Sequence, residues 1–506
     1  MMQPLLACLG LPLLLTIGAA AAPAAAVPAA AAGDTPFRTL TGVVTSADNH
    51  RYLSVPFDLP AGVVRLTVTF SYTGKDQHTA IDIGLFDPQR FRGWSGGARD
   101  HMTLGIADAT PGYLPGPLPA GKWRLVLGIP NIRPGVRAAY TADVFIERTP
   151  GVTSFADAPL DDHPGWYRGD LHMHSGNSDA KCASQSGKRV PCPVYRTVEA
   201  AAARGLDFIA LTDHNTISQF DALRALQPAF DKLLLVPGRE ITTFFGHSNV
   251  FGLTDFLDWR MTAPTYAQAA KWMTTAEQEG GVVSLNHPGV PSGEQCMGCG
   301  WEVKDLPRHA VSAVEVVNGG TLAATGSADN PAQGFTLWEK LLDRGDHVTG
   351  IGGSDNHDAD MPADRPAAIG TPTTVVYMRD LSVQGLLDGI RSGRVFIDVD
   401  GTKDRLLDLS ASAGDRHADM GQTLRVRDGD MVRFAVTLKG VPSGTEQLVI
   451  DGHADDSGRA HFDASHPASI TPWRYPGQSH WLRVDVRNDQ GRLILIGNPI
   501  YIAPAG

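Results

Sequence analysis

The chain has 506 residues, of which 42% are hydrophobic and 19% are charged. This length and balance are typical of a well-cored globular protein with two or three domains. The 43 Lys and Arg residues are outnumbered by 54 Asp and Glu residues, which gives a formal charge of −11, and no basic stripe is present. Nucleic acid is therefore not expected as the main partner.

Residues 1–33 are predicted to form a signal peptide and an Ala/Pro tract. Residues 5–22 are apolar, and the small residues that follow suit cleavage by signal peptidase, although the first residues contain no Lys or Arg. A membrane anchor is the alternative, but an Ala/Pro tract makes a poor spanning helix. Because no later stretch is long and apolar enough to cross a bilayer, we expect an exported protein, periplasmic or secreted, without a stable membrane span.

Residues 34–150 are predicted to form an N-terminal β-sandwich. Residues 63–70, 80–86 and 123–127 are β-branched or alternate in polarity, and Gly/Pro turns separate them. Helical periodicity is absent from this region. Antiparallel strands in two packed sheets are the expected arrangement. Packing against the rest of the chain is the expected role, and a binding module is the alternative.

Residues 160–403 change to alternating strands and helices. The expected strands are 206–212, 233–236, 248–253, 282–285, 311–317 and 347–351, and the expected helices are 197–204, 265–279 and 335–344. Such alternation predicts a parallel sheet with helical crossovers. The length is typical of a closed (β/α) barrel, whose catalytic groups lie at the carboxyl ends of the strands.

Residues 404–506 become β-rich again. Residues 431–438 and 481–487 alternate in polarity. This pattern predicts a second small β-sandwich, so the expected fold class is α/β, with a central barrel flanked by two sandwiches.

Four cysteines remain if Cys8 is removed with the signal peptide: Cys182, Cys192, Cys296 and Cys299. An even number in an exported protein indicates disulfides. Local pairs, Cys182–Cys192 and Cys296–Cys299, are the first choice. A zinc site made of four thiolates and a crossed pairing remain open, because both cysteine-bearing loops are expected to rim the same pocket.

Histidines and carboxylates follow the apolar runs of the central region. His172 and His174 stand two residues apart, which in a strand places both on one face, and Asp179 follows five residues later. Asp355 and His357 repeat the spacing. Further donors near strand ends are His214, Glu240, His247 and His287. A donor set of imidazole and carboxylate suits Zn, Mn or Fe, so the pattern predicts a metal centre and a hydrolase.

Asp213 and Glu240 are the candidate catalytic residues. Asp213 is adjacent to His214, so the two cannot share a strand face. We therefore predict that Asp213 orients an imidazole by accepting its second N–H, with direct metal ligation as the alternative. Asp213 or a metal-bound water is expected to carry the proton to the leaving group.

At this point the sequence resembles a known family. The segments 170–179, 211–215, 238–240, 246–247, 286–288 and 354–357 look, in this order, like the motifs of the PHP (polymerase and histidinol phosphatase) superfamily. Its exported arrangement looks most like the carbaryl-hydrolase type, down to residues 497–502. The resemblance implies a distorted, TIM-like barrel of about seven β/α units.

The resemblance also implies how two or three divalent ions would be held. The first ion would be bound by His172, His174, Glu240 and Asp355. The second would be bound by Glu240, His247 and His287, with Glu240 bridging. The third would be bound by Asp179, His214 and His357.

The implied activity is hydrolysis of a small-molecule substrate by metal-activated hydroxide. A phosphoesterase is the first hypothesis, since this is the common superfamily activity, and a carbamate, ester or amide hydrolase of the carbaryl-hydrolase type is the second. A cationic anchor near the ions would favour an anionic phosphate, and an apolar aromatic pocket would favour an aryl ester or carbamate. A metal-binding surface-recognition protein without catalysis is the alternative from another class. The sequence does not indicate the oligomeric state.

Overall fold

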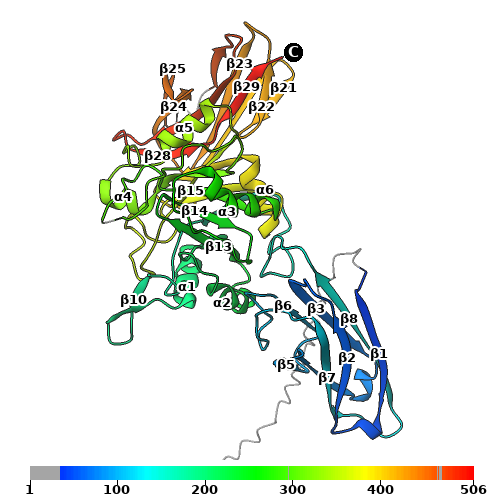
Figure 1. Cartoon of the computed structure of the whole chain (residues 1–506). Helices are drawn as coiled ribbons and strands as arrows, with labels where there is room; N and C mark the ends of the chain where they lie inside the picture. Colours follow the sequence, from blue (N-terminus) through cyan, green and yellow to red (C-terminus); the bar gives the residue numbers. More distant parts are fainter. Residues whose placement is uncertain (1–34, 295, 464, 466–469, 506) are drawn as a thin grey trace, which may run out of the picture. The chain divides into compact units, whose positions relative to one another are not determined.

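The computed structural model describes residues 35–294, 296–463, 465 and 470–505 (Figure 1). The predicted signal peptide and Ala/Pro tract at 1–33 lie outside the described residues. None of the described helices has the length and apolarity that crossing a bilayer requires.

The N-terminal region consists of two four-stranded antiparallel sheets packed face to face. Strands cover 65–70 of the expected segment 63–70 and all of 80–86 and 123–127, and inward-facing Leu66, Val68 and Leu125 are fully buried in the core between the sheets. The first sheet has the order β1 (Arg38–Thr45), β8 (Arg137–Glu147), β3 (Arg65–Tyr72) and β6 (His101–Leu104). The second has the order β2 (Tyr52–Leu59), β7 (Gly121–Asn131), β4 (Ala80–Phe86) and β5 (Phe91–Gly96).

The central strands belong to one large mixed sheet. Their order is β17 (Thr349–Gly353), β16 (Ala313–Asn318), β15 (Val282–Asn286), β14 (Gly246–Phe251), β13 (Leu234–Thr243), β12 (Phe208–Leu211), β9 (Gly165–Asp170), β18 (Thr373–Met378) and β19 (Val395–Asp398). The helices are α1 (Val194–Arg204), α2 (Gln219–Leu226), α3 (Tyr266–Gln278), α4 (Gly319–Thr325), α5 (Phe335–Asp343) and α6 (Val383–Ser392). A separate hairpin pairs β10 (Lys181–Ala183) with β11 (Arg189–Pro191).

The predicted α/β fold class with a (β/α)7 TIM-like barrel is wrong. The described residues contain twenty-nine strands and only six α-helices, and β14, β18 and β19 each pair antiparallel with their neighbours. Strand β13 runs on to Thr243, which leaves two residues before β14 begins at Gly246. A connection this short forces a hairpin, because a parallel pair needs a crossover of a dozen residues or more. The chain is therefore mostly β, with several sheets.

The C-terminal strands continue the central sheet, because β19 pairs antiparallel with β28 (Leu493–Gly497). Beyond β28 the sheet adds β27 (His480–Arg487), β24 (Gly444–Ile450), β25 (His453–Phe462), β29 (Ile500–Pro504) and β22 (Thr423–Val426). A second sheet consists of β21 (Arg416–Asp419), β20 (Leu406–Ala413), β23 (Met431–Lys439) and β26 (Ile470–Arg474). Buried residues of both sheets, such as Phe434 and Val484, share one core.

The sheet brings several strand ends to one edge. Strands β9, β12 and β13 pair in parallel, as do β15, β16 and β17, and the two antiparallel ladders of β14 give both groups the same direction. The carboxyl ends of six strands therefore meet at one edge, and the polar segments that follow them converge there.

Candidate metal centre

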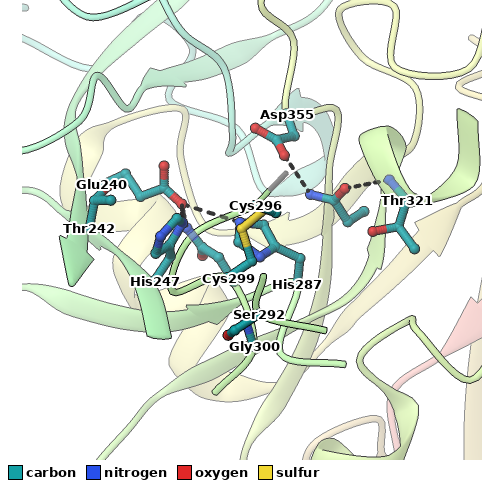
Figure 2. Close-up of a disulfide and its surroundings, with 12 residues drawn as sticks. Glu240, Thr242, His247, His287, Ser292, Cys296, Cys299, Gly300, Thr321 and Asp355 are labelled. Carbon is teal, nitrogen blue, oxygen red and sulfur yellow. Dashed lines mark hydrogen bonds and ion pairs between the residues drawn. A yellow bond between two sulfur atoms is a disulfide. The ribbon is translucent and has the colours of Figure 1, made fainter. Parts of the chain in front are cut away.

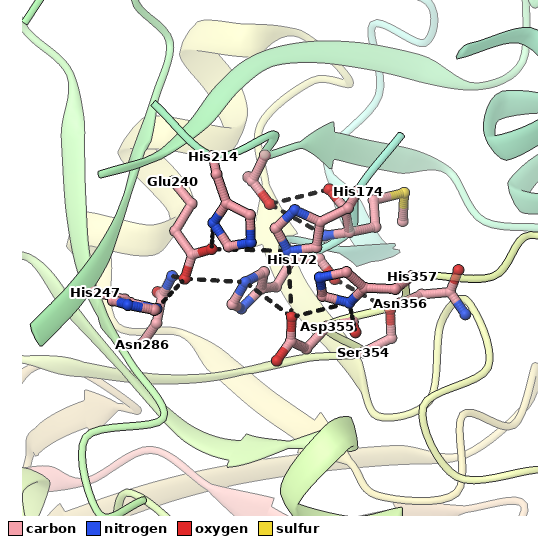
Figure 3. Close-up of polar contacts among 12 residues, drawn as sticks. His172, His174, His214, Glu240, His247, Asn286, Ser354, Asp355, Asn356 and His357 are labelled. Atoms are coloured by element: carbon pink, nitrogen blue, oxygen red, sulfur yellow. Dashed lines mark hydrogen bonds and ion pairs between the residues drawn. The ribbon is translucent and has the colours of Figure 1, made fainter. Parts of the chain in front are cut away.

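All nine residues predicted as metal ligands come together at this edge of the sheet. Figure 3 labels all of them except Asp179 and His287. Short ladders beyond the strand ends hold the segments that carry them. The backbone N–H of His174 donates to Asn356 O at 2.9 Å, and that of Asp355 donates to His172 O at 2.8 Å. An isolated parallel bridge likewise joins His214 to Glu240. Backbone hydrogen bonds alone therefore join the loop after β9 to the loop after β17.

The first group contains His172, His174 and Asp355, whose ligand atoms lie within 4.8 Å of one another. The Asp355 Oδ1 atom is 3.3 Å from His172 Nε2 and 3.2 Å from His174 Nε2. Glu240 lies on the other side, with Oε1 at 3.3 Å from His172 Nε2 and Oε2 at 3.7 Å from His174 Nε2. These four residues are the set that the family resemblance implied for one ion.

Glu240 joins this group to a second one. Its Oε1 atom lies 3.4 Å from both His247 Nδ1 and His287 Nε2. The antiparallel register places His247 opposite Asn286, so the two imidazoles come from adjacent backbones. Asn286 also donates from Nδ2 to Glu240 Oε1 at 2.9 Å, which orients the carboxylate. One carboxylate therefore faces imidazoles on two sides, as a bridging ligand does.

A third group contains Asp179, His214 and His357, together with His174. Asp179 Oδ1 lies 3.3 Å from His357 Nε2 and 3.8 Å from His214 Nε2. The rings of His174 and His357 stack with centroids 4.0 Å apart, so this group is continuous with the first.

The centre is closed at one end and open at the other. The side chains of His172, His174 and Glu240 are no more than 1% exposed, whereas those of His357 and Asp179 are 38% and 59% exposed. Solvent and small molecules therefore reach the centre from the side of the third group.

The electrostatics of the centre favour ionised carboxylates. Burial acts to raise the pKa of Glu240, but the charges of His172 and His214 hold that pKa well below its usual range. The pKa of Asp179 is lowered to about 2: burial acts to raise it, and the hydrogen bond and charge of His357 outweigh that effect. Burial lowers the pKa of His174 to about 4, which leaves its imidazole neutral, the form that binds metals.

Two of the proposed ligands occupy strained backbone conformations. His287 has φ of 28° and Asp355 has φ of 54°, in the left-handed region that residues other than glycine rarely adopt. Such strain is retained where the surrounding structure fixes it, and it occurs frequently at functional sites. Here the left-handed residue follows the last residues of β15 or β17 and turns the chain toward the centre.

The residues fit a cation. His172 Nε2 is buried and lies 3.3 Å from an oxygen of both Glu240 and Asp355, yet among the described residues it has no hydrogen-bond partner. A cation at this position would pair with the nitrogen and with both carboxylates, in place of the proton that gives His172 its charge. The donors are imidazole nitrogens and carboxylate oxygens, a set that suits Zn, Mn or Fe.

Asp213 lies beside the centre, but its hydrogen bonds do not include the imidazole that the sequence predicted as its partner. Its carboxylate accepts from Ser175 N and Ser175 Oγ at 2.7 Å and from Ser178 Oγ at 2.6 Å. Strand β12 ends at Leu211, so the alternation of faces on which the prediction relied no longer applies at Asp213. Asp213 therefore holds the loop that leads to Asp179.

Glu315 is a further residue of the centre that sequence reasoning missed. It is 1% exposed on β16, and its Oε1 and Oε2 atoms lie 3.1 Å and 3.3 Å from His172 Nδ1. Oε2 also accepts the backbone N–H of His287 at 2.9 Å, and Oε1 accepts from Asn318 Nδ2 at 3.1 Å. The signal was a single carboxylate within the apolar run 313–317.

The four described cysteines form the two local pairs predicted, Cys182–Cys192 and Cys296–Cys299. The first closes the β10–β11 hairpin, and the second lies beside His247 and His287 (Figure 2).

Comparison with known proteins adds little to this geometry. No protein-family model matches the chain, and no curated protein matches it. Among the solved structures that match, a β-glucuronidase of Parabacteroides merdae with glycerol in its active site aligns with 93% of this chain at 10% identity and a TM-score of 0.18. The chain spans 64% of that protein's length, and a similarity this low carries no argument about fold or function.

Proposed function

We propose that this protein is a metal-dependent hydrolase that cleaves phosphoesters. The observation that carries the proposal is the convergence of six histidines and three carboxylates from separate strand ends around Glu240 and Asp355. The proposal retains the resemblance to the PHP superfamily and the expectation of export, with which the two disulfides agree.

Two or three divalent ions, Zn, Mn or Fe, are the proposed cofactors. His172, His174, Glu240 and Asp355 would hold the first, Glu240, His247 and His287 the second, and Asp179, His214 and His357 the third. Such ions supply a nucleophile at neutral pH by lowering the pKa of water, and they stabilise the oxygen that gains charge.

The chain's own residues supply the frame for this reaction. Glu240 keeps the two buried groups at a fixed separation, and Asn286 keeps its carboxylate from rotating. His174 stays neutral at physiological pH. The open side, at Asp179 and His357, admits a small substrate and water, while the closed side excludes bulk solvent from His172.

A carbamate or aryl ester hydrolase is the second candidate, and a specific observation favours it. Phe244 and Met297 are 78% and 76% exposed; Phe244 lies in the turn that leads to His247, and Met297 lies between the two cysteines of the Cys296–Cys299 disulfide. On the side of the third group, Arg189 pairs with Asp358 and Arg196 pairs with Asp360 in the segment that follows His357. An apolar leaving group that reached Phe244 and Met297 would gain contacts there, whereas a phosphate would not.

The experiment is metal analysis of protein purified without chelators, followed by assays with a phosphomonoester, a phosphodiester and an aryl carbamate. We expect bound metal, hydrolysis of at least one phosphoester, and loss of hydrolysis in His172→Ala and Asp355→Ala. His163→Ala, at an exposed histidine outside the centre, is the control and should keep full activity. Circular dichroism confirms that each variant is folded. Bound metal without turnover would indicate a binding protein, and turnover in either ligand variant would refute the assignment.

A further inference from the structure

The disulfide Cys296–Cys299 places a sulfur next to two of the proposed metal ligands. The ligand atoms of His247, His287 and Cys299 all lie within 4.8 Å of one another (Figure 2). Cys299 is 2% exposed, whereas Cys296 is partly exposed. The buried half of the disulfide therefore faces the metal centre, and the accessible half faces away from the interior.

Both imidazoles have a buried nitrogen with nothing to bind. His247 Nδ1 and His287 Nε2 lie 3.4 Å from Glu240 Oε1. His247 Nε2 and His287 Nδ1 are buried and lack a hydrogen-bond partner within the described part of the chain. A disulfide sulfur is a poor ligand and a weak acceptor, so in the oxidised protein the sulfur next to these rings does not serve as a donor.

The loop around Cys299 is held in place by contacts that do not involve the disulfide. The backbone N–H of Trp301 donates to Pro288 O at 3.2 Å, and that of Glu302 donates to Phe245 O at 2.9 Å. Gly298 has φ of 74°, and a Cβ there would lie 2.3 Å from Thr243 O, so the loop packs directly on the β13–β14 hairpin. Cys299 therefore stays beside the histidines when the disulfide is opened.

We propose that reduction of Cys296–Cys299 frees Cys299 as a thiolate ligand beside His247 and His287, and that these three residues then form a nitrogen and sulfur site that prefers zinc. The inference rests on the metal centre of the proposed function and deepens it, because it makes metal selectivity depend on the redox state of one disulfide. Thiolate ligands select Zn over Mn and other hard cations, and they bind in the deprotonated form.

The reductant is a dithiol, and the steps balance. One thiolate of the dithiol attacks the accessible Cys296 sulfur, the S–S bond breaks, and Cys299 leaves as a thiolate next to His247 and His287. The second thiol of the reductant then displaces Cys296 and closes its own disulfide. Two electrons pass to the protein. The Cys296 sulfur takes up the proton of the second reductant thiol, and the Cys299 sulfur remains a thiolate, the form that would bind a cation. The other disulfide resists, because Cys182 and Cys192 are each 1% exposed.

A matched pair of variants tests the inference without a reductant. Cys296→Ser leaves Cys299 as a permanent thiol in the buried position, and Cys299→Ser leaves Cys296 as a thiol in the exposed position. Each full-length protein is stripped of metal and titrated with Co²⁺, whose thiolate complexes show an intense near-ultraviolet charge-transfer band. We expect this band in Cys296→Ser, and its absence in Cys299→Ser and in the oxidised wild type.

Zinc competition gives a second readout. We expect Cys296→Ser to bind Zn²⁺ about tenfold or more tightly than Cys299→Ser, because even partners that only orient a ligand change metal affinity by ~10–100-fold. Mn²⁺ affinity should be equal in the two variants.

The outcomes separate this inference from the proposed function. Cobalt binding in all three proteins, with visible d–d absorption but no charge-transfer band in Cys296→Ser, would overturn the inference and leave the metal centre standing. No cobalt binding in any of them would overturn the metal centre itself. Should Cys296→Ser fail to fold, wild type reduced by a dithiol and then freed of it replaces that variant, and the absence of the band there overturns the inference equally.

Discussion

Glu315 is expected to set the affinity of the centre although it binds no ion itself. Its two oxygens receive three donors, from His172 Nδ1, His287 N and Asn318 Nδ2, at 2.9–3.3 Å. Glu315→Gln keeps the shape but replaces one oxygen with an NH₂ group, so at least one of these buried donors meets another donor. An unsatisfied buried donor costs about 1–3 kcal/mol, and outer partners of metal ligands change affinity by ~10–100-fold. We expect Zn²⁺ affinity to fall by about this factor.

The assay is competition for Zn²⁺ against a chromogenic chelator, together with thermal unfolding of the metal-free protein. Asp346→Asn is the matched control, since it makes the same acid-to-amide change in a carboxylate that is 1% exposed and pairs with Arg344. Both variants should lose stability, but only Glu315→Gln should lose zinc affinity. Wild-type affinity in Glu315→Gln would refute the argument, because it would show that the imidazole of His172 needs no support on its far side.

Two further predictions concern residues outside the ligand set. Asp108 is fully buried between Arg65 and Arg224; burial acts to raise the pKa of this carboxyl, but the two guanidinium groups hold it below its usual value. The contribution of the ionised carboxylate to stability is therefore present above about pH 4 and is lost as the pH falls below that value. Asp108→Asn should lower the free energy of unfolding by about 3–5 kcal/mol at pH 7 and by less at pH 3. Urea titrations at the two pH values measure this, and an equal loss at both would contradict the argument. Asp213→Asn should weaken binding of the ion held by the third group, because Asp213 holds the loop that leads from Ser175 to Asp179. The shape of the pH–rate profile should stay unchanged, since Asp213 is not expected to move a proton. Loss of one limb of that profile would support the predicted role of Asp213 as a proton carrier.

The sequence predicted the donors better than the sheet that carries them. Histidines at the boundaries of apolar runs locate strand ends without reference to pairing, so His172 and His287, after such runs, and His247, before one, were found from local pattern alone. Strand direction depends on connections, and the two-residue turn after Thr243 was not visible while β13 was expected to end at residue 236. The hydrogen bonds of Asp213 go to Ser175 and Ser178 rather than to the predicted imidazole, since alternation of faces stops where β12 stops, at Leu211. For Glu315 the sequence showed only a carboxylate within an apolar run, and nothing local indicated its hydrogen bonds with His172 and His287.

The open and closed ends of the centre differ in how strongly a bound cation would stabilise their charged side chains. Asp179 and His357 are exposed enough that water can solvate them when no cation is bound. Glu240, His172 and His287 lie in a nearly dry interior, where unpaired charge is costly and where hydrogen bonds from Asn286 and Glu315 satisfy only part of the polar surface. Ion binding at the closed end should therefore contribute to folding stability, whereas ion binding at the open end should exchange more freely with solvent. The disulfide loop lies against the closed end. Reduction that frees the Cys299 thiolate should therefore affect the ions whose binding contributes most to folding stability.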